Sequence, residues 1–373
     1  MSPNFRGPRS LKTIGVTVGN EHVIGLSAPQ VESTVFRARH NDDEFAAPRV
    51  VFELVKIEPL VTTQTSAVSS LAGNKGFLSP VKLARARQED SGALNETEFI
   101  ESCEPDEIAP YCAGIVMSPW VNRLDGGKWT YKGQELEVPI TIHDQQNSNH
   151  GLLEFAEYHL ISRVDTADES SVLLGATIQP RRGYPFLVET TVKYALHADG
   201  LTVTHGAVNR SADAAPYAVG GHPYFKISGT PTEQLVLQSP AASIIDVDER
   251  QIPTGRSSVA GTRFDVRAGQ RIGANFFDHN FADLEREADG MAHTYLRSDN
   301  GGQIDVWQDA AFKYVVLFTP DFYPTRSGKV WAAAVEPQTA AANAFNTGED
   351  LLWLGTDEPF SASWGVRVQE PTA

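Results

Sequence analysis

The strongest constraint on the fold is a two-residue alternation in residues 186–209. In FLVETTVKYAL (186–196), Phe186, Val188 and Val192 fall on one face of an extended chain, and Glu189 and Lys193 fall on the other. Successive strand side chains point to opposite faces, so this pattern predicts a strand with one buried and one solvated face. An Asp-Gly turn signal precedes LTVTHGAVN (201–209), which predicts an antiparallel hairpin.

Further strand patterns run through most of the chain. KWTYKGQELEVP (128–139) predicts a second hairpin around Lys132 and Gly133, and strands are expected at 303–308, 313–319 and 361–368. The sequence contains no repeat of fixed period and no glycine-rich nucleotide-binding motif. A chain of 373 residues can bury a large core. We therefore predict an all-β protein with few short helices, and we treat residues 1–373 as one domain.

Residues 46–101 differ from the rest. VVFELVKI (50–57) has a strand-like composition, but TTQTSAVSSLAG (62–73) is low in charge and rich in small polar residues. We interpret 46–101 as a long surface insertion or irregular excursion, with a helical turn near 80–87. We assign this segment no chemistry.

Charge limits the partners. The formal net charge of −16 would repel a phosphate backbone, so we expect no nucleic-acid partner and no anionic membrane surface. A small neutral or cationic molecule is the better match. No apolar run approaches the length of a membrane span, and residues 1–19 lack the apolar core of a signal peptide, so we expect a cytoplasmic location.

The two cysteines favour neither a disulfide framework nor a zinc site. Cys103 and Cys112 are nine residues apart, and the chain has no second pair. We expect two free thiols, and we expect no metal.

The candidate general base lies in KVWAAAVEPQTAAANAFNTG (329–348). Glu336 follows the short apolar run 330–335, and Pro337 is expected to stop that strand because it has no N–H to donate. A carboxyl group after apolar residues should be partly buried, which raises its pKa towards the range of a general base. The alternative is a strand-end glutamate that caps a loop or pairs with an arginine.

The candidate general acid lies in APYAVGGHPYFKI (215–227). Gly220 and Gly221 precede His222, where a kinked backbone would turn the imidazole towards a cleft. The aromatic residues that follow would limit its rotamers. A buried structural histidine is the alternative, and His205, inside a predicted strand, is interpreted as structural.

Three more residues have the chemistry of ligand contacts. Arg123 lies beside a Gly-Gly turn, where its guanidinium can hold several oxygens, or pair with Asp125. His150 precedes a glycine, so it can approach a ligand closely, or be a satisfied loop residue. Asp278 lies among phenylalanines and needs partners, such as sugar hydroxyls or the neighbouring His279.

Six separated segments resemble the motif series of the aldose 1-epimerases (mutarotases), in that family's own order. The resemblance covers about residues 111–368 and implies a large antiparallel β-sandwich (galactose mutarotase-like supersandwich) with the sugar in a cleft on one sheet. The segments are PWVNRL (119–124), NHGLL (149–153), GGHPYF (220–225), FDHNF (277–281), AVEPQTAAANAFNTG (334–348) and WGVRV (364–368).

The resemblance also implies roles. Glu336 corresponds to the general base and His222 to the general acid, with no cofactor. The residues implied to contact the sugar are Arg123, His150, Asp278, Asn122 and Tyr224. Two positions depart from the family pattern: Lys226, where the family often has Asn, and Leu152, where it often has Gly.

The predicted function is interconversion of the α and β anomers of a free aldohexose. One group removes the proton of the C1 hydroxyl while another protonates the ring oxygen, and the ring opens and recloses. The alternatives are a hexose-6-phosphate 1-epimerase, for which Lys226, Arg181 and Arg182 could hold phosphate, and a non-catalytic carbohydrate-binding protein. A glycosidase would instead need two carboxylates. We expect a small sugar as the partner, and a monomer or homodimer.

Overall fold

The computed structural model describes residues 98–371, apart from 102–107, 155, 167–169, 198–199, 326 and the side chain of Asp165. Before residue 98 it describes only the backbones of short strands. Cys103 and the loops within 46–101 therefore lie outside the described residues.

The larger sheet has ten strands, and it contains the predicted hairpin. In that hairpin Val188–His197 pairs with Gly200–Asn209 over its whole length, and Val188, Val192 and Tyr194 are buried. The prediction of a one-sided strand is confirmed. In spatial order the strands are β24 (Gln270–Arg271), β21 (Val236–Gln238), β26 (Ala292–Arg297), β27 (Gln303–Gln308), β33 (Pro359–Gln369), β17 (Gly200–Asn209), β16 (Val188–His197), β15 (Ser170–Ile178), β14 (Glu157–Asp165) and β6 (Gly76–Phe77).

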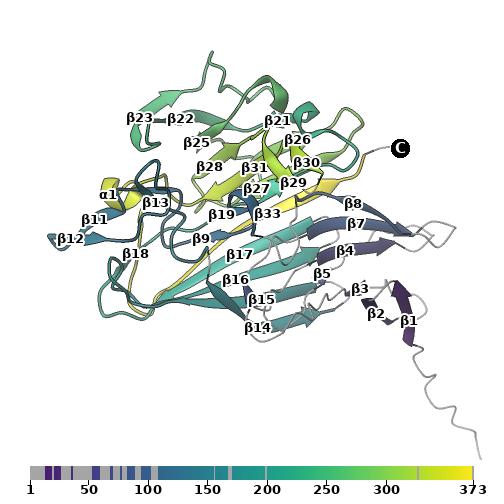
Figure 1. The fold of residues 1–373 in the computed structure, drawn as a ribbon, viewed down its shortest axis with the longest axis horizontal. Coiled ribbons are helices and arrows are strands. Elements are labelled where there is room, and N and C mark those ends of the chain that lie inside the picture. The colour runs from purple at the N-terminus through teal and green to yellow at the C-terminus, as the bar shows by residue number, and fades with distance from the viewer. Residues whose placement is uncertain are drawn as a thin grey trace, which may run out of the picture.

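The second sheet has eight strands and packs against the first, as Figure 1 shows. Val203, Val306 and Val366 of the larger sheet share one buried cluster with Leu317 and Val335 of the smaller one. The predicted all-β sandwich is confirmed. The strands are β23 (Pro253–Ser258), β22 (Ala241–Val247), β25 (Asp278–Leu284), β28 (Tyr314–Phe318), β31 (Ala333–Gln338), β19 (Gly220–Gly221) and β9 (Val116–Met117), with β20 (Tyr224–Phe225) also beside β31.

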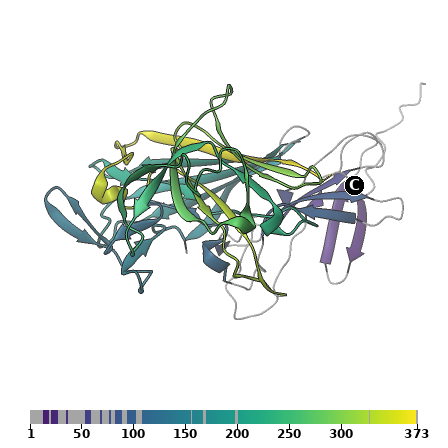
Figure 2. The same cartoon turned by 90° about the horizontal axis from the view of Figure 1, so that it is seen from above.

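The remaining elements are short. Figure 2 shows β1, β2 and β3 at one end of the molecule. The small sheets contain β1 (Thr13–Val18), β2 (Glu21–Leu26) and β3 (Val35–Phe36); β5 (Val68–Ser69), β4 (Glu53–Glu58), β7 (Lys82–Gln88) and β8 (Leu94–Glu98); β10 (Arg123–Asp125) and β13 (Asn147–Asn149); β11 (Lys128–Tyr131) and β12 (Gln134–Glu137); β18 (Ala215–Tyr217) and β32 (Leu352–Leu354); β29 (Tyr323–Thr325) and β30 (Gly328–Val330). The helices are η1 (Pro110–Cys112), η2 (Thr232–Gln234), η3 (Ile272–Ala274) and α1 (Ala344–Thr347). In the described part of the chain, no helix has the length and apolar character that crossing a membrane requires.

The helical turn expected near 80–87 is wrong, because strand β7 covers Lys82–Gln88. Alanine, leucine and arginine favour a helix in isolation. Here β7 lies between β4 and β8, and pairing on both sides satisfies the backbone groups that a helix would otherwise bond internally. That residues 1–373 form one domain with an insertion at 46–101 stays a prediction.

The expectation that Pro337 stops its strand is also wrong. Strand β31 continues to Gln338, and Glu336 lies inside it opposite Val316 of β28. The Pro337 carbonyl faces Gly220, so the missing N–H faces the same side, away from β28. On that side β19 pairs with Gln338 and β20 with Ala333 and Ala334, so Pro337 interrupts only this ladder.

Candidate active site

The candidate site is centred on a buried contact between an imidazole and a carboxyl group. Nε2 of His222 lies 3.3 Å from Oε1 of Glu336. Glu336 projects from the middle of β31, and His222 occupies the short link between β19 and β20, both of which flank β31. A side chain of this short link therefore contacts a side chain of the strand that β19 and β20 flank. Two residues 114 positions apart in the sequence meet here, so the structure brings together the two groups predicted for proton transfer.

His222 is held by its neighbours on several sides. The ring of Tyr224 stacks beside it at 5.2 Å between centroids, and the His150 ring meets it edge-on at 5.3 Å. The Tyr224 hydroxyl donates to the carbonyl of Tyr111, and Tyr224 is fully buried. Tyr224 thus lies behind the imidazole as a support.

Glycine is needed at Gly221 for space. A side chain on Gly221 would come within 2.7 Å of Trp364, and the φ of Gly221 is not in the left-handed region. Close approach between the two sheets, more than a backbone kink, explains the glycine before His222.

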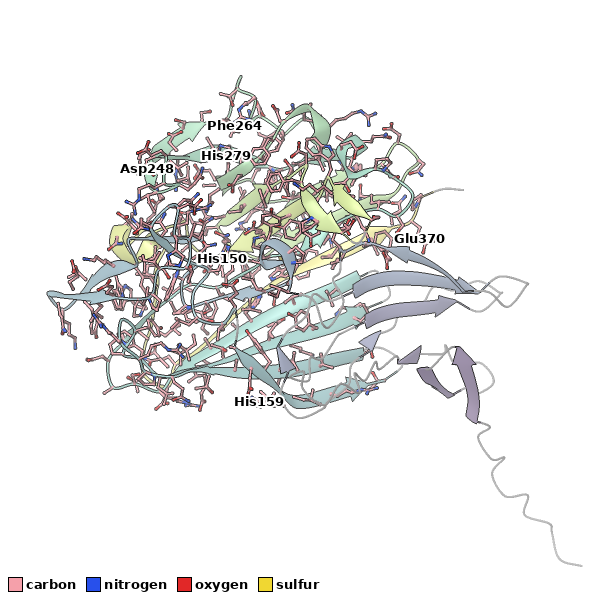
Figure 3. The ribbon with its side chains drawn as sticks, viewed as in Figure 1. His150, His159, Asp248, Phe264, His279 and Glu370 are labelled. Carbon is pink, nitrogen blue, oxygen red and sulfur yellow. The ribbon has the colours of Figure 1, made fainter. Side chains whose placement is uncertain are left out.

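His150 reaches the site through a tight backbone crossing, in the region of β9, β13 and β19 in Figure 3. Its φ is 56°, and its N–H donates to the carbonyl of Asn122 at 3.0 Å. Gly151 has φ 82°, and a Cβ there would lie 2.1 Å from the carbonyl oxygen of Ser118. The crossing therefore requires the glycine that follows His150. At this position the His150 ring packs against the ring of His222.

Arg123 and Asp278 form the more open end of the site. Their closest guanidinium and carboxylate atoms are 4.0 Å apart, and the two side chains are 14% and 32% exposed. Nε of Arg123 donates to Oε1 of Gln145 at 2.6 Å, and Nη1 of Arg123 donates to Oδ1 of Asn122 at 3.1 Å. Asn122, with φ 52°, thus helps to orient Arg123. The alternative of an Arg123–Asp125 pair is wrong, because Asp125 pairs with Arg250 at 2.8 Å.

Asp278 starts β25, opposite Phe318 of β28. Its backbone N–H donates to Nδ1 of His279, which leaves its carboxylate facing Arg123. The exposed ring of Phe276, two residues before Asp278, packs edge-on against Phe318. The open end therefore combines a cation, an anion and an aromatic surface, which suits a ligand with both hydroxyl groups and C–H faces.

Burial dominates the electrostatics of the central pair. It raises the pKa of Glu336 well above its usual range, helped by the charge of Asp278 and opposed by the Gln338 hydrogen bond and by Arg123. Burial also lowers the pKa of His222 to about 3. Burial likewise lowers the pKa of His150, with the charges of His222 and Arg123 acting in the same direction. In the unliganded protein the neutral forms are favoured, so a proton shared by the pair resides on the Glu336 carboxyl.

Sequence reasoning missed two amide side chains that support Glu336, those of Gln338 and Asn280. Nε2 of Gln338 donates to Oε2 of Glu336 at 3.2 Å, and Nδ2 of Asn280 donates to Oε1 of Gln338 at 3.3 Å. Both amides lie inside the quoted motifs VEPQ and DHNF. The signal was available for Gln338, since residues two apart on a strand share a face. Asn280 required knowledge that β25 neighbours β28 and β28 neighbours β31.

Cys112 is a free thiol near the site, as predicted. Its Sγ donates to Oε1 of Glu154 at 3.3 Å, and burial, followed by the charge of Glu154, raises the pKa of the thiol. A thiol held protonated in this way is a poor nucleophile. Among the described residues, no group of three or more His, Cys, Asp or Glu side chains is arranged to hold a metal ion.

The two positions that depart from the family pattern have structural partners. Lys226 pairs with Glu98 at 2.7 Å and with Glu101 at 3.2 Å. Leu152 donates its N–H to the Ser118 carbonyl and packs against the main core. Neither side chain takes part in the contacts of the candidate site described above.

Comparison with known proteins identifies the family. Residues 89–363, well over half of the chain, match the family model described as aldose 1-epimerase. The chain belongs to the aldose 1-epimerase family. This family member is 32% identical over 267 residues to the Escherichia coli (strain K12) protein named "Uncharacterized protein YihR", covering 71% of this chain and 82% of that one. It is 27% identical over 205 residues to the aldose 1-epimerase of the same organism, covering 53% and 56% of the two chains.

Solved structures show the same fold. The GalM/aldose epimerase homologue of C. elegans matches with a TM-score of 0.68 at 15% identity, covering 87% of this chain and all of that one. The galactose 1-epimerase of Lactobacillus acidophilus NCFM matches with a TM-score of 0.62 at 20% identity, covering 97% and 100%. The galactose mutarotase-like β-sandwich of this aldose 1-epimerase family member is thus shared with both.

Proposed function

We propose that this family member is an active aldose 1-epimerase that interconverts the anomers of a free aldohexose. The observation that carries the proposal is the buried contact of 3.3 Å between His222 and Glu336. Anomer interconversion acts on two oxygens bonded to the same carbon, the C1 hydroxyl oxygen and the ring oxygen. A base and an acid in contact with each other can address two such neighbouring oxygens at once.

The pair needs only one proton to operate. Before sugar binds, burial favours a protonated Glu336 and a neutral His222. Transfer of that proton to Nε2 of His222 gives a carboxylate and an imidazolium with no change in total charge. Arg123, whose charge lowers the pKa of Glu336, favours this transfer, and sugar hydroxyls would add hydrogen bonds to the carboxylate. Glu336 then takes the proton of the C1 hydroxyl while His222 protonates the ring oxygen, and the ring opens.

The reverse steps use the same groups. After rotation about the C1–C2 bond, Nε2 of His222 removes the proton from the former ring hydroxyl as that oxygen attacks C1. Glu336 returns its proton to the aldehyde oxygen, which becomes the C1 hydroxyl of the other anomer. The Gln338 amide holds Oε2 of Glu336 throughout, so Oε1 remains the atom that exchanges protons. Each well-placed group is worth about 10²–10⁴-fold in rate.

The remaining residues have binding roles in this proposal. Arg123 and His150 contact sugar oxygens and stabilise charge as the ring opens, and Asp278 orients a hydroxyl at the open end. Asn122 holds the guanidinium and Tyr224 supports His222, so both act through their neighbours.

A free sugar is favoured over a sugar phosphate. The cations weighed for phosphate have other partners: Lys226 pairs with Glu98 and Glu101, and Arg182 lies 3.8 Å from Glu137. Arg181 donates to the carbonyl of Gln179. Polarimetry with free hexoses, pentoses and hexose 6-phosphates would test this choice. Acceleration confined to the phosphorylated sugars would contradict it, and no acceleration with any sugar would favour a binding protein.

The mechanism is tested by Glu336→Gln. We expect the folded variant to lose at least about 10²-fold in the rate of glucose or galactose mutarotation, because the amide cannot take a proton. The control is Asp305→Asn, which alters another buried carboxylate in contact with a histidine, His293, at 2.7 Å but on the larger sheet. Wild-type turnover by Glu336→Gln, measured by optical rotation, would remove Glu336 as the base.

A further inference from the structure

A small cavity lies behind His222, and residues of both sheets line it. Its volume is about 30 Å³, which exceeds the ~10–15 Å³ that one water molecule needs. His222 and Val116 line it from the smaller sheet, and Val203, His205 and Trp364 line it from the larger one. Tyr194 also lines it, and the remaining walls are apolar, so a water held there would bond to few polar side chains, the two histidines among them.

Two buried ring nitrogens on the cavity-lining histidines have no hydrogen-bond partner among the described residues. They are Nδ1 of His205 and Nδ1 of His222, whose residues are 1% and 5% exposed. Leaving a buried polar group without a partner is costly, so a partner is expected. The other nitrogen of His222 faces Glu336, and the two neighbouring rings, Tyr224 and His150, offer no atom that bonds to Nδ1.

The tautomer of His205 follows from its second contact. Nε1 of Trp364 can only donate, and it donates to Nε2 of His205 at 3.0 Å. Nε2 is therefore the acceptor, and burial lowers the pKa of His205 to about 4, which keeps the ring neutral near pH 7. The single ring proton of His205 must then be on Nδ1. His205 presents a hydrogen-bond donor, and the cavity contains the space for an acceptor.

We propose that one water molecule occupies this cavity and accepts hydrogen bonds from Nδ1–H of His205 and Nδ1–H of His222, which makes His205 a positioning residue for proton transfer at His222. This inference rests on the proposed function of His222. While the Glu336 carboxyl holds the shared proton, Nε2 of His222 faces it as the acceptor, so the ring proton of His222 is on Nδ1, where the water accepts from it. Nε2 is then the nitrogen that gains and loses the shared proton. Without His205 the cavity would lose one of the two buried ring nitrogens that need a partner there, and a water would be held less firmly.

Two measurements on the unaltered protein test the water directly. A high-resolution crystal structure should show one ordered water within hydrogen-bond distance of both Nδ1 atoms. Nitrogen-15 NMR of the histidine rings should show Nδ1 protonated in both residues, with signals assigned by their loss in His222→Asn and His205→Phe. An empty cavity, or an unprotonated Nδ1 on either ring, would overturn the proposal.

Variants test the consequence for catalysis. His205→Phe keeps a ring of similar shape but removes both nitrogens, and we expect kcat to fall about tenfold with little change in KM. His205→Gln should recover most of this loss, since its amide can accept from Trp364 and donate to the water. Adding His205→Phe to His222→Asn should cause no further loss. Equal losses in the Phe and Gln variants, or additive losses in the double variant, would assign His205 a structural role only.

If His205→Phe does not fold, Trp364→Phe replaces it as the test, because it removes the donor that fixes the His205 tautomer. We expect a smaller fall in kcat and a mixture of His205 tautomers by NMR. An unchanged tautomer would contradict the proposal. Failure of wild-type protein to accelerate mutarotation would end the proposed function but leave the crystallographic and NMR results valid. An empty cavity in an active enzyme would end only this inference.

Discussion

In the described part of the chain two buried histidines contact carboxylates, His293 in the larger sheet and His222 beside the smaller one. In the larger sheet, Nδ1 of His293 on β26 lies 2.7 Å from Asp305 on β27, and Nε2 lies 3.1 Å from Asp289. Asp305 is also 3.5 Å from Arg367 on β33. In the smaller sheet, His222 contacts Glu336 through Nε2 alone, and its Nδ1 has no partner among the described residues.

The difference between the two contacts is hydrogen-bond satisfaction. The side chains of His293 and His222 are 3% and 6% exposed, so burial does not separate them. His293 has a carboxylate on each nitrogen, and such a network fixes the positions of its protons and stabilises the fold. Burial raises the pKa of both carboxyl groups, but at Asp305 the His293 hydrogen bond and the charges of His293 and Arg367 oppose it. The pKa of Glu336, in contrast, is raised well above its usual range, so a proton can move between Glu336 and His222. We expect the first contact to contribute stability and the second to contribute chemistry.

Replacing each histidine should give the largest contrast. We expect His222→Asn to lower kcat about 10²–10⁴-fold with a small change in KM, because its proton transfer occurs only on the way to the open chain. His293→Asn should keep the turnover of its folded fraction. Polarimetry at several sugar concentrations measures both. An effect of His222→Asn on KM alone would make His222 a binding residue.

Removing each carboxylate should give the opposite contrast, because here stability is measured in place of turnover. Asp305→Ala removes a partner shared by His293 and Arg367, while His293 keeps Asp289, and we expect a loss of about 1–3 kcal/mol in the free energy of unfolding. Glu336→Gln removes a group that burial disfavours in its charged form, so it should cost much less. Urea unfolding followed by tryptophan fluorescence measures both values. Equal losses would show that the two contacts have the same structural weight.

The pH dependence of stability should report His222. Its pKa is lowered from 6.5 to about 3 on folding, so between these values the unfolded chain binds more protons than the native protein. The contribution of His222 to stability should therefore fall as pH falls through this window, by up to about 1.4 kcal/mol per pH unit, while Glu336, whose pKa is raised on folding, contributes with the opposite sign. His222→Asn should remove that contribution. An unfolding free energy with the same slope in both proteins would show that His222 is not buried in its neutral form.

The smallest effect is expected at the edge of the larger-sheet cluster. Arg367 is 45% exposed and 3.5 Å from Asp305, so its ion pair is screened by water. We expect Arg367→Gln to lower the free energy of unfolding by less than about 1 kcal/mol and to leave mutarotation unchanged. Thermal unfolding and polarimetry check the two parts. A loss of unfolding free energy as large as that of Asp305→Ala would show that Arg367 supplies the stabilising charge of this cluster.

The sequence predicted those parts of the fold that depend on local alternation. The β16–β17 hairpin and strand β27 occur where the two-residue pattern placed them, because one face of each strand is buried along its whole length. The fate of Pro337 was not predictable in this way. Whether a proline ends a strand depends on which neighbour its missing N–H would face, and that is a property of the assembled sheet.

The same limit applies to the site. Motifs placed Glu336, His222, Arg123 and His150 in the sequence, and the structure brings them together. The supporting contacts depend on sheet order: Asn280 reaches Gln338 across 58 residues, and Trp364 reaches His205 across 159. No spacing rule within a single segment connects such pairs, so these contacts required the three-dimensional structure.

Pro337 has one more consequence for the imidazole beside it. Any other amino acid at this position would present an N–H on the β19 side, where the pairing of Gly220 with Gln338 makes the carbonyl of Gly221 the expected acceptor. Proline leaves that bond unmade. The backbone of His222 bonds on the opposite side of its segment, to Gly114 and Ile115 just before β9. The link that carries the imidazole is therefore tied towards β9, directly after the residue at which its ladder with β31 lacks a bond.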